Sequence, residues 1–257
     1  MTKKRVQIAF RSDDAGSCES VNLAIAEAAA AGTMKNISVM ACGPALEQAV
    51  SLLKDVEGID LGLHLTLNAE WVTIKWSPAL LAEQVPTLLE PGSPYFTTAP
   101  RVLRERGFSV EEAVAEAEAQ LARARSMGLR IAYMDEHMGV GGLPGLRPGL
   151  QKLCDREGIP HLNSLNLMRL PTTENTPLVE GWLMALKDAS EGTYLVVTHP
   201  GRVAPDMEAF YEVGGTPGII ARERDAERQA LTDPALTAGL DLLGVESVRF
   251  SEFIAGL

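Results

Sequence analysis

The stretch that decides the fold runs from Val6 to Asp14 and reads Val-Gln-Ile-Ala-Phe-Arg-Ser-Asp-Asp. Its apolar part, Val6–Phe10, is typical of a buried strand, and two carboxylates follow directly after it. Apolar residues at helical spacing come next, over residues 21–28, and Gly32 ends that pattern. A buried strand, a polar turn and an amphipathic helix form one βα unit, which predicts a parallel sheet covered by helices.

The same unit recurs along the whole chain. Further strands are predicted at 36–41, 59–63, 129–134, 159–162, 193–198 and 245–250, and helices at 44–53, 109–128, 148–158 and 233–244. About seven such repeats in 257 residues favour an α/β fold with a closed or incomplete (β/α) TIM-like barrel over a doubly wound layer. We expect a single domain over residues 1–257.

Two long insertion loops interrupt this rhythm, at about 68–108 and 202–221. They are rich in proline and glycine, and they carry the aromatic residues Trp71, Trp76, Tyr95, Phe96, Phe210 and Tyr211. Long loops with their own aromatic residues are more often functional than idle. The aromatic rings either stack on sugar rings at the mouth of a barrel or pack together as small excursions from it.

Composition excludes several classes of function. A formal net charge of −11 leaves no broad basic face for nucleic acid. The three cysteines Cys18, Cys42 and Cys154 have no CxxC spacing, which argues against a disulfide framework and favours a reducing compartment. The apolar run after the basic residues 1–5 is too short for a signal peptide, and no segment approaches the roughly 18 apolar residues of a membrane span. We therefore expect a cytoplasmic protein without a nucleic-acid or membrane partner.

Titratable side chains follow four of the predicted strands. Asp13 and Asp14 follow the first, and His64, His137 and His199 end three others. The loops after parallel strands gather at one face of a barrel, so these five residues are expected to converge there. Taken alone, an acidic pair often organises a turn and a single histidine is more often structural, but three of the four histidines on one face favour a shared site. The fourth histidine, His161, has no acidic sequence neighbour, and we expect it to be structural.

One carboxylate and two imidazoles make a three-ligand metal site with open positions for water and substrate. Such a metal ion lowers the pKa of bound water to about 7 and polarises a carbonyl group. A second carboxylate can then take a proton from water, and a third histidine can protonate a leaving amine. This set predicts amide or ester hydrolysis. The chain has neither a GxSxG nucleophile motif nor a glycine-rich phosphate loop that would favour another chemistry.

At these residues the sequence resembles the YdjC-like carbohydrate deacetylases. The resemblance rests on Arg11-Ser12-Asp13-Asp14-Ala15-Gly16, Gly62-Leu63-His64-Leu65-Thr66-Leu67 and Thr198-His199-Pro200-Gly201, and on Ala230-Leu231-Thr232-Asp233-Pro234 near the end. It implies an irregular barrel of the polysaccharide-deacetylase type, often a homodimer, that removes acetyl groups from N-acetylglucosamine-type sugars or a related amide. It also implies one divalent metal ion. Nitrogen and carboxylate ligands without thiolate suit zinc best, with cobalt, iron, manganese, nickel and magnesium left open.

Carried over to this chain, the family pattern makes Asp14, His64 and His137 the metal ligands. Asp13 becomes the general base, and His199 the acid or a substrate contact. The family's histidine-rich stretch is reduced here to Asp135-Glu136-His137-Met138-Gly139-Val140-Gly141, which keeps only its first histidine. This loss motivates an alternative, a non-catalytic sugar-binding or regulatory protein that retains the fold. A metal-dependent sugar isomerase is a weaker third possibility, since it needs more carboxylate ligands.

Overall fold

The computed structural model describes residues 6–162, 165–172 and 176–254, so the basic residues 1–5 lie outside it. Within these residues six strands form one parallel sheet. The strands are β1 (Val6–Ala15), β2 (Asn36–Val39), β3 (Asp60–Leu65), β4 (Ile131–Glu136), β5 (Gly192–Thr198) and β6 (Val245–Ser247). Their order is β4-β3-β2-β1-β5, and β6 pairs with the first residues of β1. The parallel α/β prediction is confirmed.

The predicted strand at 159–162 is not a regular strand, but it helps to close the barrel. His161 forms only an isolated bridge with Met134, and the amide of Leu162 donates to the carbonyl of Met134. Farther along, the amide of Met168 donates to the carbonyl of Leu195 on β5. The two outer strands, β4 and β5, are therefore each hydrogen-bonded to the segment between α5 (Leu146–Glu157) and α6 (Leu178–Lys187). The barrel is irregular, with six regular strands instead of the predicted seven or so.

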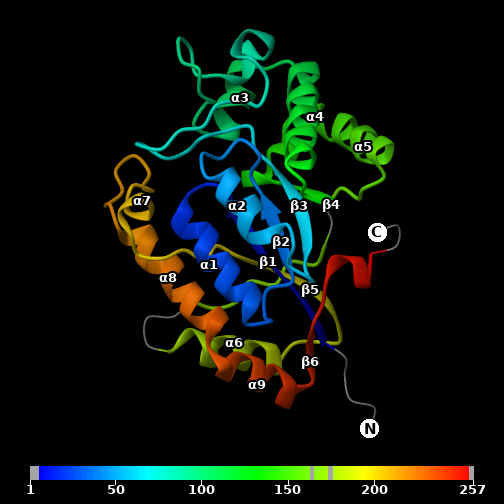
Figure 1. The fold of residues 1–257 in the computed structure, drawn as a ribbon, viewed down its shortest axis with the longest axis vertical. Coiled ribbons are helices and arrows are strands. Elements are labelled where there is room, and N and C mark those ends of the chain that lie inside the picture. Colours follow the sequence, from blue (N-terminus) through cyan, green and yellow to red (C-terminus); the bar gives the residue numbers. More distant parts are fainter. Residues whose placement is uncertain (1–5, 163–164, 173–175, 255–257) are drawn as a thin grey trace.

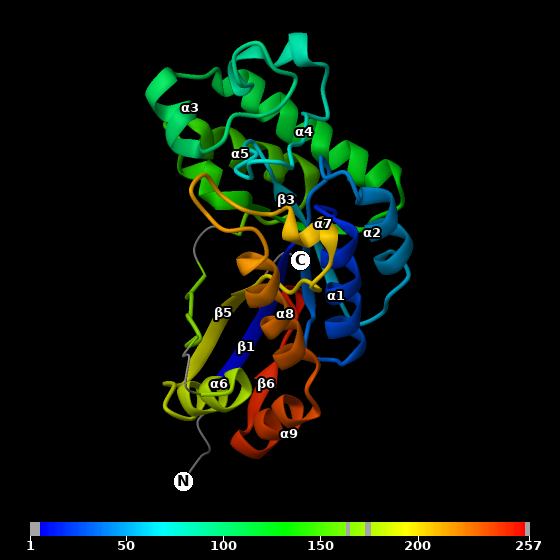
Figure 2. The same ribbon diagram turned by 90° about the vertical axis from the view of Figure 1, so that its left-hand side faces the viewer.

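Helices cover the outside of this sheet. They are α1 (Glu19–Ala30), α2 (Leu46–Leu53), α3 (Pro100–Arg106), α4 (Val110–Ser126), α5 (Leu146–Glu157), α6 (Leu178–Lys187), α7 (Pro205–Glu208), α8 (Ile219–Thr232) and α9 (Pro234–Leu243). Figure 1 shows α1 and α8 on one side of the sheet and α4 and α5 on the other. Figure 2 shows α3 at one end of the molecule and α6 and α9 at the opposite end, beside β6. None of the helices in the described residues is long and apolar enough to cross a membrane.

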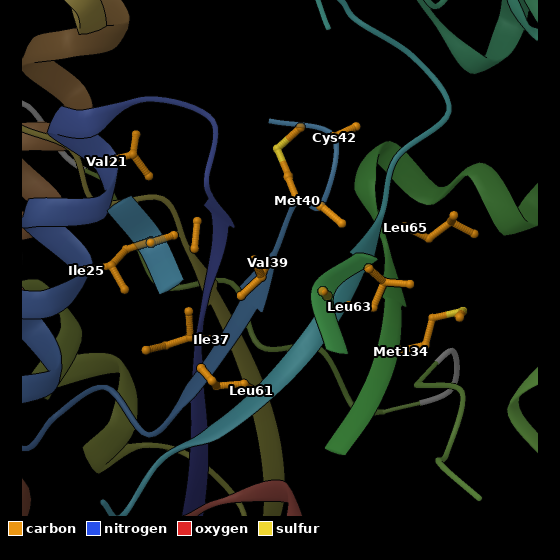
Figure 3. Close-up of a cluster of buried hydrophobic side chains, with 14 of the residues drawn as sticks. Val21, Ile25, Ile37, Val39, Met40, Cys42, Leu61, Leu63, Leu65 and Met134 are labelled. Atoms are coloured by element: carbon orange, nitrogen blue, oxygen red, sulfur yellow. The ribbon is translucent and has the colours of Figure 1, made fainter. Parts of the chain in front are cut away.

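The main core lies between the sheet and its helices. Figure 3 shows Val21 and Ile25 of α1 beside Ile37 of β2, and all three side chains are fully buried. The opposite face of the sheet points into the barrel, because successive strand residues point to opposite faces. There the ring of Tyr133 lies 2.0 Å from the position that a Cβ atom on Gly62 would take, so a glycine is required at this point.

The two long segments pack as excursions from the barrel, and neither is a bare loop. Residues 68–108 contain two short 3₁₀ helices and α3, and the predicted loop at 202–221 contains α7 and the start of α8. Trp71 and Phe210, one from each segment, are buried with their ring centroids 5.3 Å apart. The amide of Val72 donates to the carbonyl of Tyr211 at 3.0 Å. Packing therefore accounts for most of these aromatic residues, and Tyr95 alone of the six is strongly exposed.

Candidate metal centre

The three residues predicted as metal ligands meet at the carboxyl ends of the strands. Asp14 lies near the end of β1, His64 on β3, and His137 directly after β4. Their ligand atoms lie within 4.8 Å of one another. Asp14 Oδ1 is 3.6 Å from His64 Nε2 and 3.3 Å from His137 Nδ1, and these two nitrogens are 3.3 Å apart. The donor atoms are an oxygen and two imidazole nitrogens, a set that suits a divalent transition metal or zinc.

A distortion of β1 brings both consecutive carboxylates into the site. In a regular strand Asp13 and Asp14 would point to opposite faces of the sheet. The pairing of β1 with β2 shifts register between Ser12 and Ala15, and Asp14 adopts a φ of +67°. Such bulges re-aim side chains, and aspartate is among the residues that tolerate positive φ. As a result Asp13 Oδ2 also approaches His64 Nε2, at 3.9 Å.

In each histidine, the ring nitrogen that faces away from the centre lies within hydrogen-bond distance of a carboxylate, which is buried for Asp135 and partly buried for Glu70. His64 Nδ1 lies 2.8 Å from Asp135 Oδ1, and His137 Nε2 lies 3.0 Å from Glu70 Oε2. An ionised carboxylate only accepts hydrogen bonds, so both imidazoles donate outward and leave the other nitrogen for a ligand. Burial would lower the pKa of His137, but Glu70 and Asp14 outweigh it and raise that pKa to about 10. The pKa of His64 is raised as well, against its burial, by Asp13 and Asp135.

The two aspartates of β1 are held by arginines instead. Arg11 makes two hydrogen bonds to Asp13, from Nε to Oδ1 at 2.6 Å and from Nη2 to Oδ2 at 2.7 Å. Arg224 of α8 donates from Nη2 to Asp14 Oδ2 at 2.8 Å. Burial would raise the pKa of Asp14, but Arg224 and His137 hold it well below its usual value. Asp14 is therefore held ionised, and the two bonds from Arg11 fix the orientation of Asp13.

A second group of possible ligands, Asp13, His64 and Asp135, already contains a cation. Arg11 Nη1 lies 2.8 Å from Asp135 Oδ2, in addition to its two bonds to Asp13. Ser38 Oγ also donates to Asp135 Oδ2, at 2.6 Å. The guanidinium group thus supplies the positive charge between these carboxylates, and this group is not a second metal site.

The residues present fit one divalent cation. The Oδ1 atom of Asp14 is buried without a hydrogen-bond partner among the described residues, although a buried carboxylate oxygen normally has one. The centre holds four carboxylates and two guanidinium groups, which formally leave two negative charges when both histidines are neutral. The carboxylates are the buried Asp13, Asp14 and Asp135 and the partly buried Glu70, and the guanidinium groups are those of Arg11 and Arg224. Buried charges need compensation, which protons on the histidines supply in the metal-free protein. A dication beside Asp14 Oδ1 would take the place of those protons.

The remaining two histidines differ in position. His199 follows β5 directly, it is partly buried, and its charge helps to lower the pKa of Asp14. Its backbone amide donates to Glu227 of α8 at 2.5 Å. His161 lies apart from the centre, with Nε2 2.7 Å from Glu136 Oε1. His161 has no acidic neighbour in the sequence, but the fold brings Glu136 of the adjacent strand β4 against it.

Sequence reasoning missed four residues of this centre, namely Arg11, Glu70, Asp135 and Arg224. Arg11 and Asp135 lie inside the quoted motifs, and a charged residue in a buried strand could have drawn attention to each. Glu70 follows the His64 motif by a few residues and had no such signal. Arg224 lies on a helix whose pattern contains several arginines, and the sequence does not distinguish it from them.

Known proteins resemble this chain over most of its length. The profile of the family described as YdjC-like protein matches residues 7–241. The chain belongs to the YdjC-like family. It is 28% identical to a carbohydrate deacetylase of Geobacillus stearothermophilus, over 94% of this chain and 95% of the relative. A carbohydrate deacetylase of Brevibacillus brevis is 27% identical, over 96% of this chain and 99% of the relative.

Solved structures share the fold. A protein from Enterococcus faecalis, described as a proposed cellobiose-phosphate cleavage protein, superimposes with a TM-score of 0.79 at 18% identity, over 96% of this chain and 98% of the other. A carbohydrate esterase of family CE4 from Streptococcus mutans superimposes with a TM-score of 0.55 at 15% identity, over 96% and 86%. The expected barrel of the polysaccharide-deacetylase type is therefore confirmed for this member of the YdjC-like family.

Proposed function

We propose that this YdjC-like protein is a metal-dependent deacetylase that hydrolyses the N-acetyl group of an amino sugar. The observation that carries the proposal is the convergence of Asp14 Oδ1, His64 Nε2 and His137 Nδ1 around a buried oxygen without a hydrogen-bond partner among the described residues. These three residues would hold one divalent cation, zinc by preference for such ligands. When bound, that cation supplies Lewis-acid polarisation of the acetyl carbonyl and activation of water.

The general base in this proposal is Asp13. Its two bonds from Arg11 hold the carboxylate in one orientation, and Oδ2 lies 3.9 Å from the ligand nitrogen of His64. Asp13 takes a proton from the attacking water as the new C–O bond forms at the acetyl carbon. A non-catalytic binding protein has no need for a second carboxylate oriented beside the metal ligands, so this arrangement favours the enzyme over the binding alternative.

The general acid is His199, which reaches the same face from the end of β5. Hydrolysis breaks the C–N bond, and the departing amine nitrogen needs a proton that His199 supplies. The products are acetate and a free amino sugar. Glu227 holds the backbone amide of His199 and so fixes the start of the loop that carries it.

The sugar part of the proposal is supported by the named relatives, two of which are carbohydrate deacetylases aligned over nearly their whole length. Met138, directly after the ligand His137, is 50% exposed with a φ of +49°. It stands where the family has a further histidine, so we propose that the substrate differs in detail from that of relatives with a full histidine cluster.

The test is metal analysis of the purified protein, followed by acetate release from a panel of N-acetylated glucosamine monomers and oligomers. We expect one equivalent of divalent metal and release of acetate that stops on chelation and returns on adding zinc or cobalt. Metal binding without hydrolysis across the whole panel would instead support the non-catalytic sugar-binding alternative.

A further inference from the structure

Within the described residues, Arg224 is the one arginine or lysine that forms an ion pair with a proposed metal ligand. Its Nη2 donates to Asp14 Oδ2 at 2.8 Å, while the second terminal nitrogen, Nη1, is buried without a partner among the described residues. The guanidinium carbon lies 5.8 Å from the ring centre of Trp71 and 5.9 Å from that of Phe210. The side chain is 9% exposed, so a full charge is buried beside Asp14.

We propose that Arg224 is a positioning residue that restricts Asp14 to binding the cation through Oδ1 alone. This inference rests on the proposed function and deepens it. A carboxylate can bind a metal ion through one oxygen or through both. Here the hydrogen bond from Arg224 occupies Oδ2, whereas Oδ1 has no such bond and faces the ligand nitrogens of His64 and His137.

The consequence concerns the positions left for reactants. A site of one oxygen and two nitrogens keeps positions open for water and for the acetyl carbonyl oxygen. If both oxygens of Asp14 bound the cation, one of these positions would be filled by protein. Arg224 thereby prevents Asp14 from binding the metal ion through both oxygens, which would be tight but unproductive. Its effect should appear in turnover and in the coordination geometry of the metal ion more than in metal affinity.

The surroundings of Arg224 hold it in place for this task. Trp71 and Phe210 come from the two long segments and lie against the guanidinium group, a favourable arrangement for a buried cation. Behind it, a Cβ atom on Gly201 would lie 3.1 Å from Arg224 Cβ and 3.0 Å from Met207 Sδ. The glycine after His199-Pro200 therefore gives the arginine the room to approach Asp14.

The experiment compares Arg224→Met and Arg224→Lys with the matched control Arg228→Met on the same helix. Arg228 pairs with Asp225 and Glu27 at 2.7 and 3.0 Å and does not contact the centre in the described structure. Each protein is loaded with cobalt. Its affinity is measured by competition with a chromophoric chelator, its visible spectrum is recorded, and its kcat and KM are measured on the best acetylated substrate.

For Arg224→Met we expect equal or tighter cobalt binding, because one like charge is removed and Oδ2 becomes free to bind. We also expect a weaker, shifted visible band from the higher coordination number, and a kcat lower by about 10–100-fold, the usual effect of losing an outer partner of a metal ligand. Arg224→Lys keeps a charged hydrogen-bond donor but lacks the planar guanidinium group. Its kcat and its cobalt spectrum should therefore lie between those of Arg224→Met and the unmodified protein. Arg228→Met should match the unmodified protein.

Two results would overturn the inference while leaving the proposed function intact. One is an unchanged cobalt spectrum and kcat in Arg224→Met. The other is a loss of cobalt affinity in a folded Arg224→Met or Arg224→Lys protein, which would mean that the arginine only keeps Asp14 in place. Circular dichroism of the loaded proteins separates these results from misfolding, and Arg224→Lys serves if the methionine variant does not fold. If the unmodified protein binds no metal and releases no acetate, the proposed function itself fails.

Discussion

The two halves of the metal centre have partners of opposite charge. On β3 and after β4, the imidazoles of His64 and His137 each hold a carboxylate, Asp135 and Glu70. On β1, the carboxylates of Asp13 and Asp14 hold the guanidinium groups of Arg11 and Arg224. The carboxylates increase the basicity and fix the tautomer of the histidines. The arginines orient the aspartates, and Arg224 also lowers the pKa of Asp14. Asp14 completes the ligand set, so we expect changes to either histidine or to its carboxylate partner to act mainly on metal binding, and a change to Asp13 to act mainly on turnover.

The largest expected effect lies in the histidine half. His64→Ala removes a ligand nitrogen, so the protein should lose its stoichiometric metal ion and, with it, measurable acetate release. His199→Ala is the matched control, because it should keep one equivalent of metal and lose only turnover. Metal analysis after gel filtration together with an acetate assay checks both. A His64→Ala protein that keeps its metal and hydrolyses substrate would show that the ligand assignment is wrong.

The second effect lies in the aspartate half. Asp13→Asn keeps the shape of the side chain but removes the base, so kcat should fall by about 10²–10⁴-fold, the range for a general base. Metal content should stay at one equivalent, because Asp14, His64 and His137 are untouched. If Asp13→Asn lost its metal instead, Asp13 would belong to the ligand set and the division between the two halves would not hold.

The third effect concerns Glu70, the carboxylate that accepts a hydrogen bond from the ligand His137. Glu70→Gln removes the negative charge beside His137 Nε2, but the amide oxygen of the glutamine can still accept the hydrogen bond from that nitrogen. We expect metal affinity to fall by about 10–100-fold, and added metal should restore most of the turnover. The exposed Glu83, in the same long segment, provides the control Glu83→Gln. An unchanged metal affinity in Glu70→Gln would mean that the charge of Glu70 does not support the ligand His137.

The same comparison explains what the sequence could predict about the site. The five site residues end strands, and parallel strands gather their ends at one face, so their convergence followed from the periodicity of the chain. The bulge that turns Asp13 and Asp14 to the same side did not, because a regular strand predicts the opposite. Glu70 and Arg224 reach the centre only through the packing of the two long segments and α8, which no local pattern encodes.

The fold was predictable to a similar extent. Apolar runs bounded by glycine and proline placed the six regular strands to within a few residues. The run at 159–162 is apolar like the six strands, but it pairs with β4 through one isolated bridge only. Whether such a run forms a full strand depends on how far the neighbouring strand extends beside it. Helix α8 begins inside the segment 202–221, which the sequence predicts to be a loop. The glycines and the proline of that segment indicate a loop and obscure the helical spacing of the apolar residues that follow.

The smallest expected effect is a pH dependence that belongs to the histidine half. In the metal-free protein the pKa of His137 is raised to about 10, above the unfolded value of about 6.5. A histidine of this kind gains a proton on folding, so its contribution to stability is complete below pH 6.5 and is lost as the pH rises toward 10. The metal-free protein should melt at a lower temperature at pH 9 than at pH 7. A bound metal ion replaces that proton, so the rise in melting temperature on adding zinc should be larger at pH 9 than at pH 6.5. Thermal melts with and without chelator measure both quantities, and an equal rise at the two pH values would mean that His137 carries no extra proton in the metal-free protein.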